Sequence, residues 1–312
     1  MTRKDVLITD YVHPVLLEGL HSMGFNTTYA PEMSRQEMER ALAGYKGVVV
    51  NTRCALDRNA IFSAQGLRWI ARLGSGLDII DLDAAREKAV DVLSAPEGNA
   101  QAVAEHAMGM LLGLANKLIS ADRNVREGGW MREAHRGWEI AGKTIGIIGH
   151  GHNGSAFGRL WKGWNVKVLA YDKYLSNYAP QGVEETTLEK LKAEADILSL
   201  HIPLTEETRE MINAEFIEAC KPGFILINTS RGKNVNLSDV CRALQSGQIG
   251  GACLDVFPTE PPGHSQGETL RAFETICGMD NVVLSPHVAG WTVESRRKIA
   301  EVLLEKIGAL RG

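Results

Sequence analysis

The run Thr144-Ile145-Gly146-Ile147-Ile148-Gly149-His150-Gly151-His152-Asn153-Gly154 decides the fold of this chain. It begins with the apolar pattern of a buried strand, a glycine-rich turn follows at once, and residues 155–161 have helical spacing. In such a unit the first glycine permits a tight turn and the second lets the backbone approach a pyrophosphate, while the third lets helix and strand pack closely. Backbone N–H groups at the start of the helix then face the phosphates.

An acidic residue stands where a dinucleotide-binding unit needs one. A second strand is predicted at residues 166–171 and runs into Asp172, which lies 18 residues after Gly154. A carboxylate there accepts hydrogen bonds from the ribose hydroxyls of NAD and repels the 2′-phosphate of NADP. Lys173 adjoins it, so tolerance of NADP stays open. Strand, helix and acid together favour NAD binding over an unrelated tight turn.

The whole chain of 312 residues alternates strand and helix patterns, which predicts an α/β protein with parallel sheets covered on both faces. A long helix is predicted from residue 100 to about residue 126, where the alternation is broken, and a final helix at residues 293–310. The length suits two domains. The predicted strands lie at residues 6–9, 47–50, 69–73, 144–148, 166–170, 196–200, 224–228, 252–255 and 282–284.

Composition excludes several classes of protein. Hydrophobic residues make up 44% and charged residues 23% of the chain, and the net charge of −4 gives no reason to expect nucleic acid or an anionic membrane as a partner. No signal peptide or membrane span is evident, so we expect a cytoplasmic protein. The five cysteines are scattered without the close spacing of a zinc site, so no metal is expected.

Polar side chains that suit one reaction follow three of the later predicted strands: Arg231, Glu260 and His287. Ligands of open parallel sheets bind beyond the carboxyl ends of the strands, so all three are expected to face the crevice that holds the cofactor. A histidine can take or give the proton that accompanies hydride transfer at a hydroxyl-bearing carbon, and a neighbouring carboxylate would orient it. An arginine grips a carboxylate in two places. The set describes the oxidation of a 2-hydroxy acid.

Each of these residues also has an ordinary structural interpretation. Arg231 suits a surface turn before Gly232, Glu260 suits a solvated loop between prolines, and His287 suits a strand end with a satisfied hydrogen bond. Their joint position at strand ends in one dinucleotide fold favours the catalytic hypothesis.

Several motifs, in this order, resemble those of the D-isomer-specific 2-hydroxyacid dehydrogenases over nearly the whole chain. Besides the glycine turn they are Arg-Leu-Gly-Ser-Gly-Leu-Asp at 72–78, Asn-Ala-Gln-Ala-Val-Ala-Glu at 99–105, His-Ile-Pro-Leu-Thr at 201–205, Asn-Thr-Ser-Arg-Gly at 228–232, Leu-Asp-Val-Phe-Pro-Thr-Glu-Pro at 254–261 and Ser-Pro-His-Val-Ala-Gly at 285–290.

The resemblance implies roles for individual residues. His287 would be the acid/base and Glu260 its partner, Arg231 would bind the substrate carboxylate and keto oxygen, and Ser75 and Gly76 would offer backbone N–H groups to that carboxylate. Arg53 would help to hold a substrate phosphate. Asp255 would bind the nicotinamide carboxamide, and His152 and Asn153 the pyrophosphate. The full set implied to contact NAD is Gly149, Gly151, His152, Asn153, Gly154, Asp172, Ile202, Thr229, Ser230, Asp255, His287 and Gly290.

The resemblance also implies two doubly wound domains. A flavodoxin-like substrate domain would comprise residues 1–98 and 288–312, and a Rossmann-type NAD-binding domain residues 99–287. Members of the family usually pair as homodimers through the nucleotide domain, with the long helix and the Trp-rich loop around residues 100–140 reaching across.

The chain departs from the family in two places. His152-Asn153 replaces the usual Arg-Ile after the glycines, and Ala55 stands near a position that often carries a lysine. Arg132, His135 and Arg136 of a neighbouring subunit could compensate for that lysine. The first candidate substrate is 3-phosphoglycerate. A glyoxylate or hydroxypyruvate reductase is the alternative within the class, and a non-catalytic NAD-sensing, corepressor-like protein is the alternative outside it.

Overall fold

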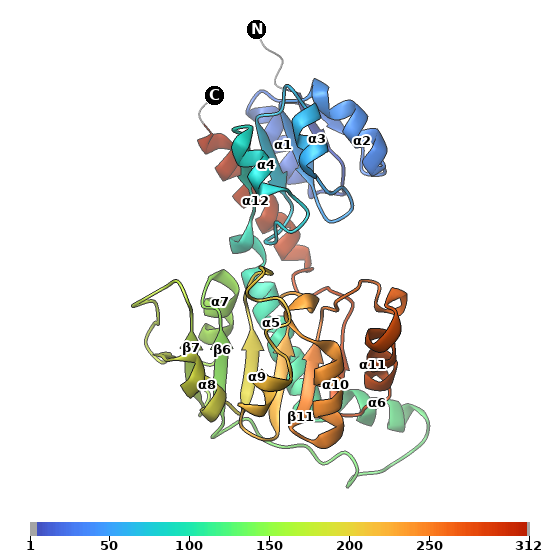
Figure 1. Ribbon diagram of the computed structural model, residues 1–312, viewed down its shortest axis with the longest axis vertical. Helices are drawn as coiled ribbons and strands as arrows, with labels where there is room; N and C mark the ends of the chain where they lie inside the picture. Colours follow the sequence, from blue (N-terminus) through green and yellow to red (C-terminus); the bar gives the residue numbers. More distant parts are fainter. Residues whose placement is uncertain (1–4, 311–312) are drawn as a thin grey trace. The chain divides into compact units, whose positions relative to one another are not determined.

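A computed structural model describes residues 5–310, which fall into two compact units. The described residues up to Ala100, together with those from Gly290 onward, form unit 1, and Gln101–Ala289 form unit 2 (Figure 1). The chain crosses from one unit to the other within α5 (Pro96–Ala115) and again after Ala289.

Unit 1 is built on a five-stranded parallel sheet in the order β2-β1-β3-β4-β5, the order of flavodoxin-like sheets. Its strands are β1 (Asp5–Ile8), β2 (Asn26–Tyr29), β3 (Gly47–Val50), β4 (Trp69–Arg72) and β5 (Asp91–Leu93). Its helices are α1 (Pro14–Ser22), α2 (Arg35–Ala41), α3 (Arg58–Ser63), α4 (Leu82–Glu87) and α12 (Val293–Ala309), with a 3₁₀ turn at Leu42–Gly44.

Helices cover both faces of this sheet because its central strands β1, β3 and β4 are largely buried on both sides. One face packs against α2, α3 and α4 through a core that includes Val48 and Ile70. The other face packs against α1 and the C-terminal α12, whose Ile299 and Leu303 are buried against Ile8. The last helix of the chain thus completes the core of unit 1.

Unit 2 contains a seven-stranded parallel sheet in the order β12-β11-β10-β9-β6-β7-β8. The chain direction across the sheet reverses between β6 and β9, which is the switch point where dinucleotide-binding sheets hold their ligand. Its strands are β6 (Thr144–Ile148), β7 (Lys167–Tyr171), β8 (Glu184–Glu185), β9 (Ile197–Leu200), β10 (Phe224–Asn228), β11 (Ile249–Leu254) and β12 (Val282–Leu284).

The helices of unit 2 alternate with these strands, except α6 (Leu118–Arg126), which precedes β6. The others are α7 (His152–Leu160), α8 (Leu188–Glu194), α9 (Ala214–Glu218), α10 (Leu237–Ser246) and α11 (Gly267–Cys277), with 3₁₀ turns at Gly232–Asn234 and Pro262–His264. Each of the predicted strand runs coincides with a strand, and the predicted class of two doubly wound parallel sheets is confirmed.

The prediction of one long helix from residue 100 to about residue 126 is wrong. α5 ends at Ala115 and α6 begins at Leu118, because Lys117 between them adopts a left-handed backbone with φ of 50°. Sequence periodicity also gave no sign of β2 and β8, whose polar residues lie exposed at sheet edges.

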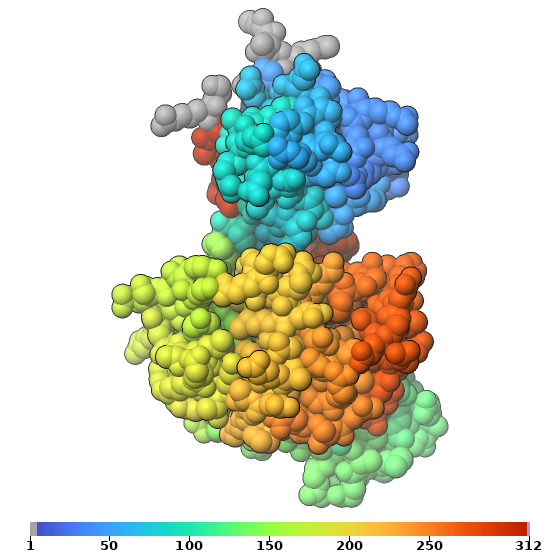
Figure 2. Space-filling view, viewed as in Figure 1, coloured from blue at the N-terminus to red at the C-terminus, as the bar shows by residue number. Residues whose placement is uncertain are grey.

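Exposed large apolar side chains gather on α6 and the segment after it: Leu118, Ile119, Val125, Trp130 and Met131. This green segment projects from the rest of unit 2 in the space-filling view (Figure 2). Between residues 5 and 310, no helix has both the length and the apolar character needed to cross a membrane. The same residues contain no cluster of His, Cys, Asp and Glu suited to a metal ion.

Candidate active site

The glycine turn joins β6 to α7 with the geometry that a phosphate-binding turn requires. Gly149 has a φ of +87°, a left-handed conformation that favours glycine. A Cβ atom on Gly154 would lie 1.9 Å from the carbonyl oxygen of Gly149, so helix and strand approach as closely as they do only because the side chain is absent. A Cβ on Gly151 would meet no heavy atom within 4 Å, so this glycine borders open space. α7 begins at His152, three residues earlier than predicted.

Asp172, directly after β7, fixes the turn from the neighbouring strand. Its Oδ2 accepts a hydrogen bond of 2.8 Å from the backbone N–H of His150, and its Oδ1 accepts from those of Tyr174 and Leu175 at 2.9 and 3.1 Å. A carboxylate oxygen can accept about two hydrogen bonds. Oδ2 therefore has capacity for a ligand hydroxyl beyond the bond that it receives from the described residues.

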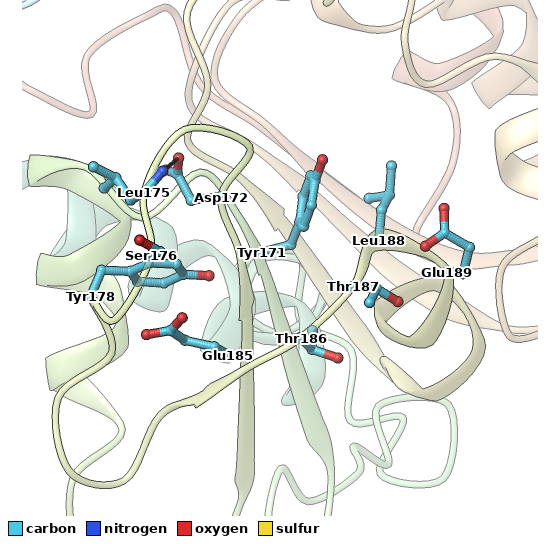
Figure 3. Close-up of a pocket in the computed structure, with 10 residues that line it drawn as sticks. All are labelled: Tyr171, Asp172, Leu175, Ser176, Tyr178, Glu185, Thr186, Thr187, Leu188 and Glu189. Carbon is cyan, nitrogen blue, oxygen red and sulfur yellow. Dashed lines mark hydrogen bonds between the residues drawn. The ribbon is translucent and has the colours of Figure 1, made fainter.

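A pocket of about 270 Å³ opens beside Asp172 (Figure 3). The end of β7 and the loop after it form one side, and β8 and the start of α8 form the other. Three carboxylates line it, those of Asp172, Glu185 and Glu189. The backbone N–H groups of Ala179 and Asn177 donate to Glu185 and keep the pKa of its carboxyl below the ordinary value. Lys173 forms an ion pair with Glu207 and so is engaged away from the pocket.

His287 and Glu260 form a hydrogen-bonded pair. The Nδ1 atom of His287 lies 2.7 Å from Oε2 of Glu260, and the backbone N–H of Phe257 donates to Oε1 at 3.1 Å. Burial alone would raise the pKa of Glu260, but the hydrogen bond and charge of His287 lower it below the ordinary value. The ionised carboxylate is an acceptor only, so it holds a proton on Nδ1 and directs Nε2 away from itself.

Asp255, which directly follows β11, holds the loop that carries His287 through several hydrogen bonds. The backbone N–H of His287 donates to the carbonyl oxygen of Asp255 at 2.7 Å, and the N–H groups of Val288 and Ala289 donate to its carboxylate at 2.9 Å each. The hydroxyl of Ser285 donates to Oδ1 at 2.5 Å. Asp255 is fully buried, and these internal groups occupy its oxygens. Its contact with the nicotinamide carboxamide stays a prediction.

Arg231 follows β10, the strand beside β11. The Nη1 group of Arg231 donates to the carbonyl of Ser230 at 2.7 Å, and the amide of Asn228 donates to the carbonyl of Arg231 at 3.0 Å. The next residue, Gly232, packs closely against the backbone of Phe257. A Cβ on this glycine would lie only 1.9 Å from the Phe257 carbonyl carbon. The loop of Arg231 therefore contacts the loop that leads to Glu260.

The order β10-β11-β12 thus brings the three predicted chemical groups to adjacent strand ends within unit 2. Ser230 is tied into its own loop, since its hydroxyl donates to Asn228 Oδ1 at 2.8 Å. Ile202, after β9, lies against the glycine turn, where its side chain would meet a Cβ on Gly149 at 2.8 Å.

Two buried polar atoms of unit 2 suit a ligand. The Oγ1 atom of Thr229 and the Oδ1 atom of Asn153 are buried and have no hydrogen-bond partner among the described residues. Buried polar atoms are normally paired, so each position is suited to a polar group of a ligand. Together with the open space at Gly151, these atoms fit a dinucleotide, which Gly151, Asn153 and Thr229 would help to hold.

The predicted substrate-binding residues Arg53, Ser75 and Gly76, and the predicted cofactor contact Gly290, lie in unit 1. The hydroxyl of Ser75 donates to Oδ1 of Asn99 at 2.7 Å. The guanidinium of Arg53 donates to the backbone carbonyls of Thr9, Pro31 and Met33. Arg53 thus links the loops after β1 and β2 within unit 1. Its role with a substrate phosphate stays a prediction.

Sequence reasoning assigned no role to Asn99, His106 or Ser285. Asn99 supports the Ser75 segment, and a Cβ on Gly290 would lie 2.7 Å from its amide nitrogen. His106 lies 2.9 Å from the hydroxyl of Ser285. A polar side chain inside an otherwise apolar helix pattern was the signal available for His106.

Comparisons with known proteins agree with this geometry. Residues 108–289 match the model of the D-isomer specific 2-hydroxyacid dehydrogenase NAD binding domain. A D-3-phosphoglycerate dehydrogenase of Archaeoglobus fulgidus is 33% identical over 97% of this chain and 56% of its own length. A hydroxypyruvate reductase of Thermotoga maritima is 36% identical over 88% of each chain. A D-lactate dehydrogenase of Aquifex aeolicus, solved with NAD and lactic acid, superposes with a TM-score of 0.84 at 28% identity, over 98% of this chain and 94% of that one.

The chain therefore belongs to the D-isomer specific 2-hydroxyacid dehydrogenase family, and residues 108–289 are its NAD-binding part. The chain spans little more than half the length of the phosphoglycerate dehydrogenase that it matches.

Proposed function

We propose that this chain catalyses hydride transfer between NAD and a D-2-hydroxy acid. The observation that carries the proposal is the bond of 2.7 Å between His287 and Glu260, on a loop at the carboxyl edge of the same sheet that holds the glycine turn. A sensor of NAD would need the turn but not this acid/base pair. The pair therefore favours an enzyme over the corepressor-like alternative.

The side chains divide the work. Bound NAD supplies the hydride acceptor. Nε2 of His287 accepts the proton of the substrate hydroxyl as the carbonyl forms, and returns it in the reverse direction. Glu260 orients the imidazole and stabilises its charged form. Arg231 binds the substrate carboxylate through its planar guanidinium. On this proposal unit 2 is the NAD-binding domain and unit 1 the substrate domain.

The preference for NAD rests on charge around the end of β7. Asp172, Glu185 and Glu189 line the same pocket, and Lys173 is paired with Glu207. A 2′-phosphate would meet like charge there, whereas ribose hydroxyls would find an acceptor on Asp172. We therefore expect weak use of NADP.

The first candidate substrate is 3-phosphoglycerate, supported by relatives that bear that name and align with nearly the whole chain. A smaller acid, hydroxypyruvate or glyoxylate, is the second candidate. One observation favours the second, since both Nη groups of Arg53 already donate to backbone carbonyls and its Nε lies 3.7 Å from a carboxylate oxygen of Asp10, which leaves little of this guanidinium for a substrate phosphate.

We also propose a homodimer paired through unit 2. Leu118, Ile119, Val125, Trp130 and Met131 are exposed large apolar side chains on one stretch of the chain, and such side chains are often buried when subunits pair. Sedimentation of the wild type and of Trp130→Ser tests this. A dimer that the substitution weakens would support the interface, and a wild-type monomer would contradict it. The cytoplasmic location stays a prediction.

Activity on a substrate panel tests the proposed function. Oxidation of D-3-phosphoglycerate, D-glycerate and D-lactate is measured with NAD and with NADP, and reduction of glyoxylate and hydroxypyruvate with NADH and NADPH. Turnover of at least one acid with NAD is expected. Tight NADH binding without turnover of any acid would instead support the sensor.

A further inference from the structure

We propose that His106 is a positioning residue for the catalytic loop, acting on His287 through Ser285 and Asp255. The inference rests on the proposed function, because it assumes that His287 is the acid/base. It concerns a side chain on α5, a helix that contributes no residue to the reaction as described above.

The contacts form a continuous chain within unit 2. Nε2 of His106 lies 2.9 Å from the hydroxyl oxygen of Ser285, and that hydroxyl donates to Oδ1 of Asp255 at 2.5 Å. The same Nε2 lies 3.6 Å from Oδ1 itself. The side chain of His106 is 27% exposed and that of Asp255 is fully buried, so water competes little for these bonds.

The direction of each hydrogen bond follows from the chemistry of the groups. A carboxylate only accepts, so the proton of the Ser285 hydroxyl points to Asp255. The lone pairs of that oxygen then face His106, which donates through Nε2–H. His106 thus fixes the rotation of the hydroxyl, and the hydroxyl fixes the carboxylate.

The carboxylate in turn holds the backbone around His287. It accepts from the N–H groups of Val288 and Ala289, and the carbonyl of Asp255 accepts from that of His287. His287 has a φ of 55°, a left-handed conformation that is strained for a residue with a side chain. A strained backbone conformation persists only where surrounding interactions hold it, and here the hydrogen bonds to Asp255 hold the backbone of His287.

Loss of His106 frees the Ser285 hydroxyl. Its oxygen also lies 3.6 Å from the sulfur of Met110, which is a weak alternative acceptor. A hydroxyl that rotates toward Met110 withdraws its bond from Asp255, so the loop that carries His287 loosens while the glycine turn on β6 is untouched. The expected effect therefore falls mainly on turnover and only slightly on cofactor affinity, since the glycine turn keeps its shape.

Hydrogen exchange at the amides of His287, Val288 and Ala289 tests the inference directly. In His106→Leu we expect exchange about fivefold faster than in the wild type, since local opening frees these amides. In His106→Gln, whose amide still donates, we expect most of the protection to return. Gln101→Leu, a substitution of an exposed residue on the same helix, serves as the matched control and leaves exchange unchanged.

Kinetics supply the second readout. His106→Leu should lower kcat about tenfold, the effect of losing one hydrogen bond to a buried network, with KM for NAD within about twofold of the wild type. His106→Gln should recover most of kcat. A uniform loss of activity, cofactor affinity and stability in His106→Leu, not rescued by Gln, would mean that the histidine only fills space and would overturn the inference.

The single variant Ser285→Ala keeps the test valid if His106→Leu folds poorly, and a double-mutant cycle adds to it where both variants fold. Ser285→Ala cuts the same chain of bonds at its centre, so it should resemble His106→Leu, and the double variant should be no worse than Ser285→Ala alone. Additive effects would contradict the relay. If the wild type turns over no hydroxy acid, the proposed function fails, while the exchange data still decide whether His106 holds the loop.

Discussion

Glu260 and His287 depend on each other through one charged hydrogen bond. The carboxylate of Glu260 has a lowered pKa because the bond to His287 and its charge outweigh the effect of burial. The ionised form therefore persists below the ordinary pKa of 4.5, and the pair loses its negative partner only as the pH falls through the lowered value. Near neutral pH, Glu260 is therefore ionised.

The first prediction follows from that charge. Glu260→Gln keeps an oxygen and a similar shape but removes the negative charge, so kcat should fall about tenfold to a hundredfold near neutral pH. The ratio of wild-type to variant rates should shrink as the pH falls through the lowered pKa of Glu260, because the wild-type carboxyl then becomes neutral too. Rates from pH 4 to pH 8 measure it. A ratio that grows toward acid pH would refute the charge argument.

Asp172 carries a separate prediction about the cofactor. Asp172→Asn retains an acceptor for the His150 N–H but removes the charge that would repel a 2′-phosphate. Affinity for NADH should fall about tenfold, the effect of weakening charged hydrogen bonds, while affinity for NADPH changes less or rises. Fluorescence titration with both cofactors measures the two constants. A larger loss for NADPH than for NADH would be inconsistent with the ribose role.

At the scale of elements, the strand–turn–helix unit contains one glycine that packing requires and one that borders open space. A Cβ on Gly154 would strike the Gly149 carbonyl oxygen, whereas a Cβ on Gly151 would enter open space. Gly154→Ala should therefore lower the free energy of unfolding by about 2 kcal/mol through overpacking. Gly151→Ala should unfold like the wild type yet bind NADH weakly, because its methyl group blocks the approach of the pyrophosphate.

Urea unfolding and NADH titration of the two alanine variants give the comparison. Each variant is the control for the other, since the substitutions are identical and lie three residues apart. Equal losses of stability in both would show that the open space at Gly151 has no bearing on ligand access.

Elements also mark where sequence reasoning succeeds and where it stops. Buried runs such as Phe224–Asn228 are apolar on both faces and predict a central parallel strand directly. The edge strand Asn26–Tyr29 is polar and exposed, so its place depends on pairing with β1 and leaves no periodic trace. The helix break at Lys117 depends on a left-handed backbone conformation, and no glycine or proline at that position indicates it in the sequence.

The candidate site divides in the same way. Glycine spacing and the polar residues at strand ends could be recognised from the sequence, because the topology of parallel sheets brings strand ends together. The link between His106 and Ser285 joins residues 179 positions apart, and the carbonyl partners of Arg53 come from two distant loops. Partners at that separation depend on tertiary packing, which local patterns do not encode.

At the scale of the whole molecule, a half-buried histidine links stability to pH. His201 lies behind the site, where Nε2 is 2.9 Å from the Ser199 hydroxyl and the ring packs against Phe157. Burial lowers the pKa of His201 from 6.5 to about 3. Between these values the unfolded chain binds a proton at this position and the folded chain does not. The free energy of unfolding therefore decreases as the pH falls through 6.5 toward 3.

This predicts a specific difference between variants. The urea midpoint of the wild type should decrease between pH 7 and pH 5, and that of His201→Gln, which cannot titrate, should decrease less. Because the midpoints at pH 7 and pH 5 are compared within each protein, the loss of stability that the substitution itself causes cancels. Parallel decreases in the two proteins would place the pH dependence elsewhere.

The central claim is that His287 assists direct transfer of hydride from a D-2-hydroxy acid to NAD. The most direct measurement follows a substrate deuterated at C2, D-3-phosphoglycerate or whichever D-acid reacts fastest, and asks where the label goes. Deuterium should appear on the nicotinamide ring with the D-enantiomer and not with the L-enantiomer. His287→Ala should slow the transfer about 10²-fold or more with NADH affinity unchanged. Label lost to water, equal transfer from the L-enantiomer, or an unimpaired His287→Ala variant would contradict the account.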